Sequence, residues 1–268
     1  MVSTNRSRIL PIAWLNALGF LVVFAVNSVS ATGLINGKTP GELSDGIKNL
    51  FVPAGLTFAI WGAIYLALAA FTAFQFRRPD EARGVGLPYL LSCAANVAWI
   101  FLWHYQQVAL SMVAMVVLLA CLLWIERLQT KALSLRVRPD RAAYWLSVVP
   151  FRIYLGWIAV ATIANATALL VVAGWDRFAI AESTWTVVAV VVAAALALLR
   201  LLLLRDAAFA AVVLWAFCGI LIRHMTTFGA QYRDVVGATA VLSLVLLSGI
   251  AVTVAAAARR CKGSGAAS

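Results

Sequence analysis

The chain alternates between long apolar runs and short polar connectors, and this pattern predicts eight membrane-spanning helices. A membrane helix needs about 20 mostly apolar residues, and eight segments reach that length. They lie at 9–31, 53–76, 87–106, 108–126, 145–173, 184–204, 206–224 and 235–258. The strict alternation of apolar and polar positions that a transmembrane barrel requires is absent. The sequence therefore predicts an all-α polytopic membrane helix bundle.

Composition narrows the class of protein further. Of the 268 residues, 64% are hydrophobic and 12% are charged, whereas a soluble domain is about half apolar and about a quarter charged. This excludes a soluble enzyme, a disordered chain and a disulfide-stapled secreted module. A net charge of +11 would suggest nucleic acid in a soluble protein, but membrane proteins gather basic residues in their cytoplasmic loops. We therefore expect the lipid bilayer as a partner, and no nucleic acid.

The distribution of basic residues predicts the orientation. With eight spans, 15 Lys and Arg residues share the side of the N-terminus, five lie on the other side, and Arg152 falls within a span. The larger set comprises Arg6, Arg8, Arg77, Arg78, Arg83, Arg127, Lys131, Arg136, Arg138, Arg141, Arg200, Arg205, Arg259, Arg260 and Lys262. By the positive-inside rule both termini are cytoplasmic. No transit peptide is visible, which favours a bacterial inner membrane.

Two segments near the N-terminus of the chain allow two interpretations each. The span at 9–31 follows Arg6 and Arg8 like a signal peptide, but its apolar run exceeds the 7–15 residues of a signal core, which favours a retained helix. The connector at 32–52 is rich in turn residues. It either folds over the outer mouth of the bundle as a lid (residues 33–52) or is a solvated connector.

Ionisable side chains are almost absent from the predicted spans. Arg152 lies about two turns from a cytoplasmic end, where it either snorkels to the headgroups or belongs to a pathway. The four cysteines and two histidines have no metal or redox spacing, so we expect no metal site. No Ser/His/Asp or Cys/His arrangement is visible, and an enzyme is disfavoured.

Aromatic and amide side chains are the unusual feature of the spans. Trp61, Trp99 and Trp157 lie deep, and Asn96 and Asn165 accompany them at about 12–15 Å from the outer ends of their helices. One interpretation is hydrogen bonding between helices. The other is a pocket for a flat, largely apolar ligand whose orientation a few polar groups fix.

Three stretches around these residues resemble the TspO/MBR family of tryptophan-rich sensory proteins and the mitochondrial translocator protein (peripheral benzodiazepine receptor). Residues 52–65, VPAGLTFAIWGAIY, are similar to the PPxWVFxPVWTxLY signature. Residues 96–99, NVAW, followed by VAL at 108–110, are similar to NxxW…xAL, and residues 154–165, YLGWIAVATIAN, to YLAWxxFATxLN. The resemblance covers about residues 9–173, the five helices of that family.

The resemblance implies a ligand site as well as a fold. It places ligand-binding residues at Phe58, Trp61, Tyr65, Asn96, Trp99, Trp157 and Asn165. The ligand it implies is a porphyrin, another tetrapyrrole or a sterol-like molecule, and no other cofactor. This chain departs from the signature at Gly55, where the family has tryptophan, at Ala59, where it has proline, and at Met112, where aspartate is common.

These observations lead to a functional hypothesis with alternatives. Residues 1–175 would form a TspO-like five-helix domain that binds a flat hydrophobic ligand for sensing or transport, and residues 176–268 a three-helix segment with a basic tail. The alternatives are a secondary transporter, an enzyme acting on a bound pigment, and a purely structural bundle. A homodimer is left open.

Overall fold

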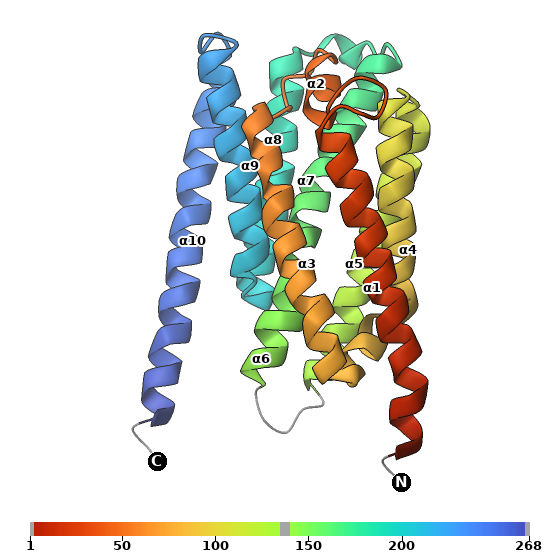
Figure 1. Ribbon diagram of the computed structural model, residues 1–268. Coiled ribbons are helices and arrows are strands. Elements are labelled where there is room, and N and C mark those ends of the chain that lie inside the picture. Colours follow the sequence, from red (N-terminus) through yellow and green to blue (C-terminus); the bar gives the residue numbers. More distant parts are fainter. Residues whose placement is uncertain (1–2, 135–139, 266–268) are drawn as a thin grey trace. The chain divides into compact units, whose positions relative to one another are not determined.

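The computed structural model describes residues 3–134 and 140–265, which form helices joined by turns and contain no strand (Figure 1). The long helices are α1 (Ser3–Ala31), α3 (Ile60–Arg77), α4 (Pro79–His104), α5 (Val108–Ser134), α7 (Val149–Val172), α8 (Glu182–Leu204), α9 (Ala207–Thr226) and α10 (Arg233–Gly265). The short ones are α2 (Pro40–Asp45), η1 (Gly55–Ala59), α6 (Arg141–Ala143), η2 (Tyr144–Val148) and η3 (Arg177–Ala179). Of the basic residues used to predict the orientation, Arg136 and Arg138 lie outside the described residues. So do the side chains of Arg6, Arg8, Arg83, Arg260 and Lys262.

The predicted number of spans is confirmed. Within the described ranges, eight helical segments are long and apolar enough to cross a membrane. The predicted boundaries differ most in α4, which begins at Pro79 and not at 87, and in α5, which continues to Ser134 and not to 126. Hydropathy marks only the part of a helix that lies in lipid, whereas the backbone hydrogen bonds of α5 continue through good helix formers such as Glu126 and Arg127.

The first compact unit comprises Met1–Lys48 and Phe58–Gly174. Its five long helices form a closed ring, in which α1 packs on α4, α4 on α5, α5 on α7, α7 on α3, and α3 on α1. Figure 1 shows α1 and α4 side by side in this unit. The ring encloses a core of large side chains that are fully buried, among them Phe71, Tyr89, Leu118 and Phe151.

Two irregular helix starts in this unit follow from proline. In α4, Gly86 has a φ of 24°, which glycine tolerates, and Pro88 restarts the helix two residues later. Before α7, the backbone N–H of Val149 donates to Tyr144 O, a π-type bond. Pro150 follows at once and has no N–H to continue the ordinary α-helical ladder. In both helices a proline thus lies within two residues of the irregular turn.

The second compact unit comprises Asn49–Thr57 and Trp175–Ser268. Its helices α8, α9 and α10 pack against one another in pairs. Residues 49–57 lie along α9 and are held by three hydrogen bonds. The backbone N–H of Ala54 donates to Gly219 O at 3.0 Å, Trp215 Nε1 donates to Thr57 O at 2.9 Å, and His224 Nε2 lies 2.9 Å from Leu50 O.

Gly219 makes this close approach possible, which gives a testable prediction. A Cβ atom at position 219 would lie 1.9 Å from Thr57 Oγ1 and 2.9 Å from Pro53 Cβ. We expect Gly219→Ala to destabilise the protein by about 1–3 kcal/mol, as overpacked interiors do. The measurement is thermal unfolding in detergent. Gly237→Ala in α10 is the matched control, because a Cβ there meets no atom within 4 Å. Equal melting temperatures for the two variants would show that residues 49–57 are not packed on α9 in this way.

Candidate functional site

A cluster of aromatic rings lies where α3 meets α7 in the first unit. Trp61 and Tyr65 are four residues apart on α3, and Tyr154 and Trp157 are three apart on α7, so each pair shares one face of its helix. Phe58 precedes α3 in the turn η1. We call these five residues the aromatic cluster.

The rings of the aromatic cluster touch one another in several orientations. Trp61 stacks on Tyr65 with centroids 5.5 Å apart and planes 17° apart. Its edge-on neighbours are Tyr154 at 5.9 Å and Trp157 at 6.3 Å, and Phe58 lies 5.9 Å from Trp157. Tyr154 and Trp157 are buried, with 3% and 4% of their surface exposed, whereas Trp61 and Phe58 are only half-buried. The cluster therefore has a packed base on α7 and partly open rings near the start of α3.

A chain of hydrogen bonds connects the cluster to two more helices. Asn27 Nδ2 on α1 donates to Val23 O at 2.9 Å and to Asn96 Oδ1 on α4 at 2.7 Å. Asn96 Nδ2 in turn donates to the hydroxyl of Tyr154 at 2.9 Å. Both asparagines are buried. In a membrane such groups must find partners within the protein, so the chain fixes α1, α4 and α7 to one another.

The structure brings five of the seven predicted site residues together and leaves two apart. Phe58, Trp61, Tyr65 and Trp157 belong to the cluster, and Asn96 joins it through Tyr154.

Among the described aromatic side chains, Trp99 makes its ring contact with Trp103, stacked at 6.0 Å, and none with Trp61 or Trp157. Asn165 faces α5, where its Nδ2 donates to Ser111 Oγ at 3.2 Å. The three deep indoles therefore do not surround one common space, although their roles in binding stay a prediction.

Sequence reasoning missed the polar face of α1. Asn16, Asn27 and Ser30 are all buried. Asn16 Nδ2 donates to Gln75 Oε1 on α3 at 3.0 Å, and Ser30 Oγ lies 3.2 Å from His104 Nε2 on α4. The spacings of 11 and 14 residues from Asn16 place all three within an arc of about 60° on a helix of 100° per residue. Helical periodicity applied to α1 would have revealed this face.

The connector between α1 and α3 is held on the C-terminal end of α4. Asn36 Nδ2 donates to His104 O at 2.7 Å, and Trp103 Nε1 donates to Pro40 O at 3.4 Å. Beneath it lies a cavity of about 200 Å³. Its lining residues are Lys38, Glu42, Leu43, Gly46, Ile47, Trp103, Gln106, Val108 and Val172. The connector is thus ordered by α2 and covers a space with both polar and apolar walls.

Helix α2 in this connector begins with a reciprocal cap. Glu42 N donates to Thr39 Oγ1 at 3.2 Å, while Thr39 N donates to Glu42 Oε2 at 2.7 Å. The hydrogen bond from the backbone N–H of Thr39 to the Glu42 carboxylate lowers the pKa of Glu42 below its ordinary value, and the bond from the Thr39 hydroxyl lowers it further. A charged Glu42 therefore stabilises the start of α2.

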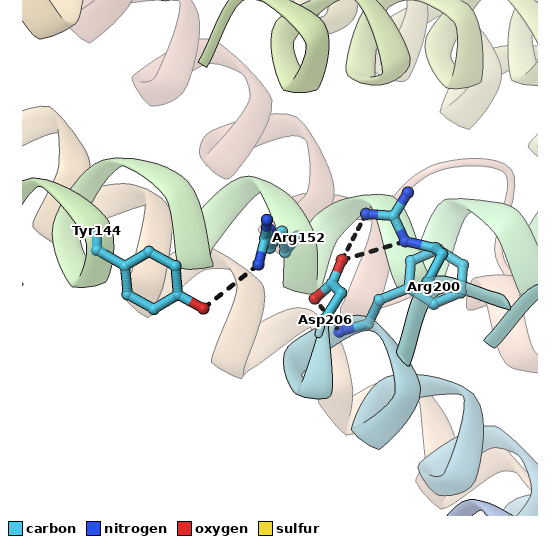
Figure 2. A network of polar contacts seen from close by, with 5 residues as sticks. Tyr144, Arg152, Arg200 and Asp206 are labelled. Carbon is cyan, nitrogen blue, oxygen red and sulfur yellow. Dashed lines mark hydrogen bonds and ion pairs between the residues drawn. The ribbon is translucent and has the colours of Figure 1, made fainter. Parts of the chain in front are cut away.

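Buried or partly buried arginines make polar contacts outside the aromatic cluster in each unit. In the first unit the buried Arg152 donates from Nη1 to the Tyr144 hydroxyl at 3.3 Å and lies over the ring of Tyr144 (Figure 2). In the second, Arg200 Nε donates to Asp206 Oδ2 at 3.1 Å, and Asp206 also caps α9 by accepting from Phe209 N (Figure 2). Each pair joins a helix to the turn next to it, which is a structural role.

Metal ligands form no cluster in the described part of the chain, where no group of three or more His, Cys, Asp and Glu side chains is placed to hold an ion. The aromatic cluster and its hydrogen-bonded amides are therefore the arrangement whose chemistry needs an explanation. Stacking surfaces with a few polar groups suit a flat organic molecule.

The chain of amides predicts an energetic coupling between α1 and α4. We expect Asn27→Ala and Asn96→Ala to be non-additive by about 0.5–2 kcal/mol in unfolding free energy, because each removes a partner of the other. Asn27→Ala and Ser111→Ala should add within about 0.5 kcal/mol, since Ser111 bonds to Asn165 and not to this chain. Denaturant titration of the four-variant cycles in mixed micelles measures both values. Zero coupling between Asn27 and Asn96 would contradict the hydrogen bond.

The cap of α2 predicts a pH dependence. Because the pKa of Glu42 is lowered in the folded protein, its stabilisation is present above the ordinary Glu range and is lost as the pH falls through the lowered value. Amide hydrogen exchange in residues 40–46, corrected for intrinsic rates, should accelerate over that acidic interval. Glu42→Ala should exchange rapidly at every pH, whereas Thr39→Ser should behave like the unaltered chain. A Glu42→Ala variant with unchanged protection would refute the role of the cap.

Comparison with known proteins shows the family of the chain. The sequence model of a family described as TSPO-like protein matches residues 13–253. The match extends through α8 and α9 and into α10, which the motif resemblance did not reach. No curated protein and no solved structure matches the chain. With eight helices able to span a membrane, this is an integral membrane protein, and the chain belongs to the TSPO-like protein family.

Proposed function

We propose that this protein binds a flat, largely apolar ligand, such as a porphyrin or a sterol-like molecule, at the aromatic cluster. The observation that carries the proposal is the meeting of Trp61 and Trp157, 6.3 Å apart and nearly perpendicular. Because the two rings are nearly perpendicular, a flat ligand can stack on the face of one ring while its edge contacts the other. Membership of the TSPO-like family supports a role in ligand binding or transport.

The remaining parts of the first unit have roles in this proposal. The chain of Asn27, Asn96 and Tyr154 holds the rings in place, because a site binds tightly when its groups are fixed before the ligand arrives. The connector that carries α2 acts as a lid. Its cavity is lined by the charged Lys38 and Glu42 and by the apolar Leu43 and Val172, which suits a molecule with both polar and apolar groups.

We further propose that the protein lies in a bacterial inner membrane with both termini in the cytoplasm. The excess of Lys and Arg on the side of the N-terminus supports this orientation. Ligands would then reach the aromatic cluster from the bilayer or from the side of the connector. The function would be to sense or transfer the bound molecule.

The test uses protoporphyrin IX and the full chain in lipid nanodiscs. We expect Trp61→Phe and Trp157→Phe each to raise the Kd by about three- to tenfold, as the loss of one aromatic contact does. Titration of the Soret band measures the Kd without relying on tryptophan fluorescence. Trp124→Phe is the matched control, because Trp124 on α5 is 46% exposed and makes no contact with the cluster. The same Kd in all four proteins would refute binding at the cluster.

A further inference from the structure

Two tyrosine rings flank Trp61, and no acceptor is found among the described residues for either hydroxyl proton. The ring of Tyr65 stacks on Trp61, and the ring of Tyr154 meets it edge-on. Tyr65 is 9% exposed, and its hydroxyl oxygen has no hydrogen-bond partner among the described residues. The two tyrosines are close enough to interact electrostatically. Buried polar atoms are nearly always paired, so an unpaired hydroxyl beside a stacking ring needs an explanation.

The hydrogen-bond chain determines what Tyr154 can offer. Val23 O can only accept, so Asn27 must present its amino group on this side. Asn96 therefore presents its oxygen to Asn27 and its own amino group to Tyr154. The oxygen of Tyr154 is an acceptor in that bond, which leaves its proton available for donation. A chain that begins at a backbone carbonyl of α1 thus ends in a hydrogen-bond donor next to Trp61.

A neutral acceptor fits this site better than an anion. The five residues of the aromatic cluster include no Lys or Arg, and an unpaired carboxylate is costly to bury. A carbonyl oxygen can accept two hydrogen bonds at once, one along each lone pair. It also lies in the plane of a conjugated ring system, so it can reach a hydroxyl while the ring stacks.

We infer that the aromatic cluster selects flat ligands that carry a neutral carbonyl oxygen, which accepts hydrogen bonds from Tyr65 and Tyr154. The inference rests on the proposed function and specifies its ligand class. Tyr65 is the decisive residue, because its hydroxyl has no partner in the ligand-free protein. Its removal should leave folding intact, whereas removal of the Tyr154 hydroxyl also deprives Asn96 of a partner.

The experiment compares 9-fluorenone with fluorene, two flat tricyclic probes that differ in one carbonyl oxygen. Equilibrium dialysis against the full chain in nanodiscs, corrected with empty nanodiscs, gives both affinities. We expect the unaltered chain to prefer fluorenone by about tenfold, as two hydrogen bonds to neutral groups allow. Tyr65→Phe should reduce this preference to about threefold or less without lowering the melting temperature.

Tyr89→Phe is the matched control. Tyr89 is also buried and its hydroxyl likewise has no hydrogen-bond partner among the described residues, but its ring contacts Phe71 and Phe151 and not Trp61. It should keep the full preference for fluorenone. A preference lost in Tyr65→Phe and kept in Tyr89→Phe supports the inference.

The contrary outcomes separate this inference from the proposed function. If the unaltered chain binds both probes equally, or if the preference survives in both Tyr65→Phe and Tyr154→Phe, the inference is overturned while ligand binding stands. If neither probe binds beyond empty nanodiscs, the inference is overturned, and the titration with protoporphyrin IX decides the proposed function separately. A fall in the melting temperature of Tyr65→Phe would instead assign its hydroxyl a structural role and would also overturn the inference.

Discussion

The hydrogen bond between the side chains of Asn27 and Asn96 is the contact on which the organisation of the first unit depends. It is 2.7 Å long and joins α1 to α4, and through Tyr154 it reaches α7. Within a bilayer, apolar side chains gain little by leaving lipid for protein, so packing and polar contacts determine which helices associate. A buried amide that satisfies a neighbour is therefore a strong constraint on register. The same bond fixes the ring of Tyr154 against Trp61.

A different contact organises the second unit. Here the polar contacts use backbone groups of residues 49–57 and not side-chain amides. The backbone N–H of Ala54 donates to Gly219 O of α9, and Trp215 Nε1 of α9 donates to Thr57 O. Backbone groups can reach a helix only where the helix has no side chain, and Gly219 provides that opening. In the first unit asparagine side chains thus join one helix to another, whereas in the second a glycine lets residues 49–57 approach α9.

The sequence predicted the parts of this protein that depend on one-dimensional patterns. Eight apolar runs sufficed for eight spans because lipid imposes a length and a polarity on each. The resemblance to family motifs likewise picked out Phe58, Trp61, Tyr65 and Trp157, whose rings meet in the structure. What the sequence could not provide was the rotation of each helix about its axis. Trp99 and Asn165 lie at suitable depth, yet their helices turn them toward Trp103 and Ser111. The depth of a residue along its helix follows from counting residues, whereas the direction of its side chain follows from how the helices pack on one another.

The departures from the TspO signature acquire a physical explanation from the second unit. Three of them lie at Val52, Gly55 and Ala59, where the signature has proline, tryptophan and proline. Val52 and Gly55 belong to the segment that lies along α9, and this segment must be slim to approach a helix backbone closely. Trp215 supplies an indole to Thr57 O from α9, so this stretch has an indole partner although Gly55 stands in place of tryptophan. The family match includes α9, so residues 49–57 and the helix on which they pack lie within one matched region. The residues that follow, Phe58 and Trp61, keep their aromatic character, as a stacking site requires.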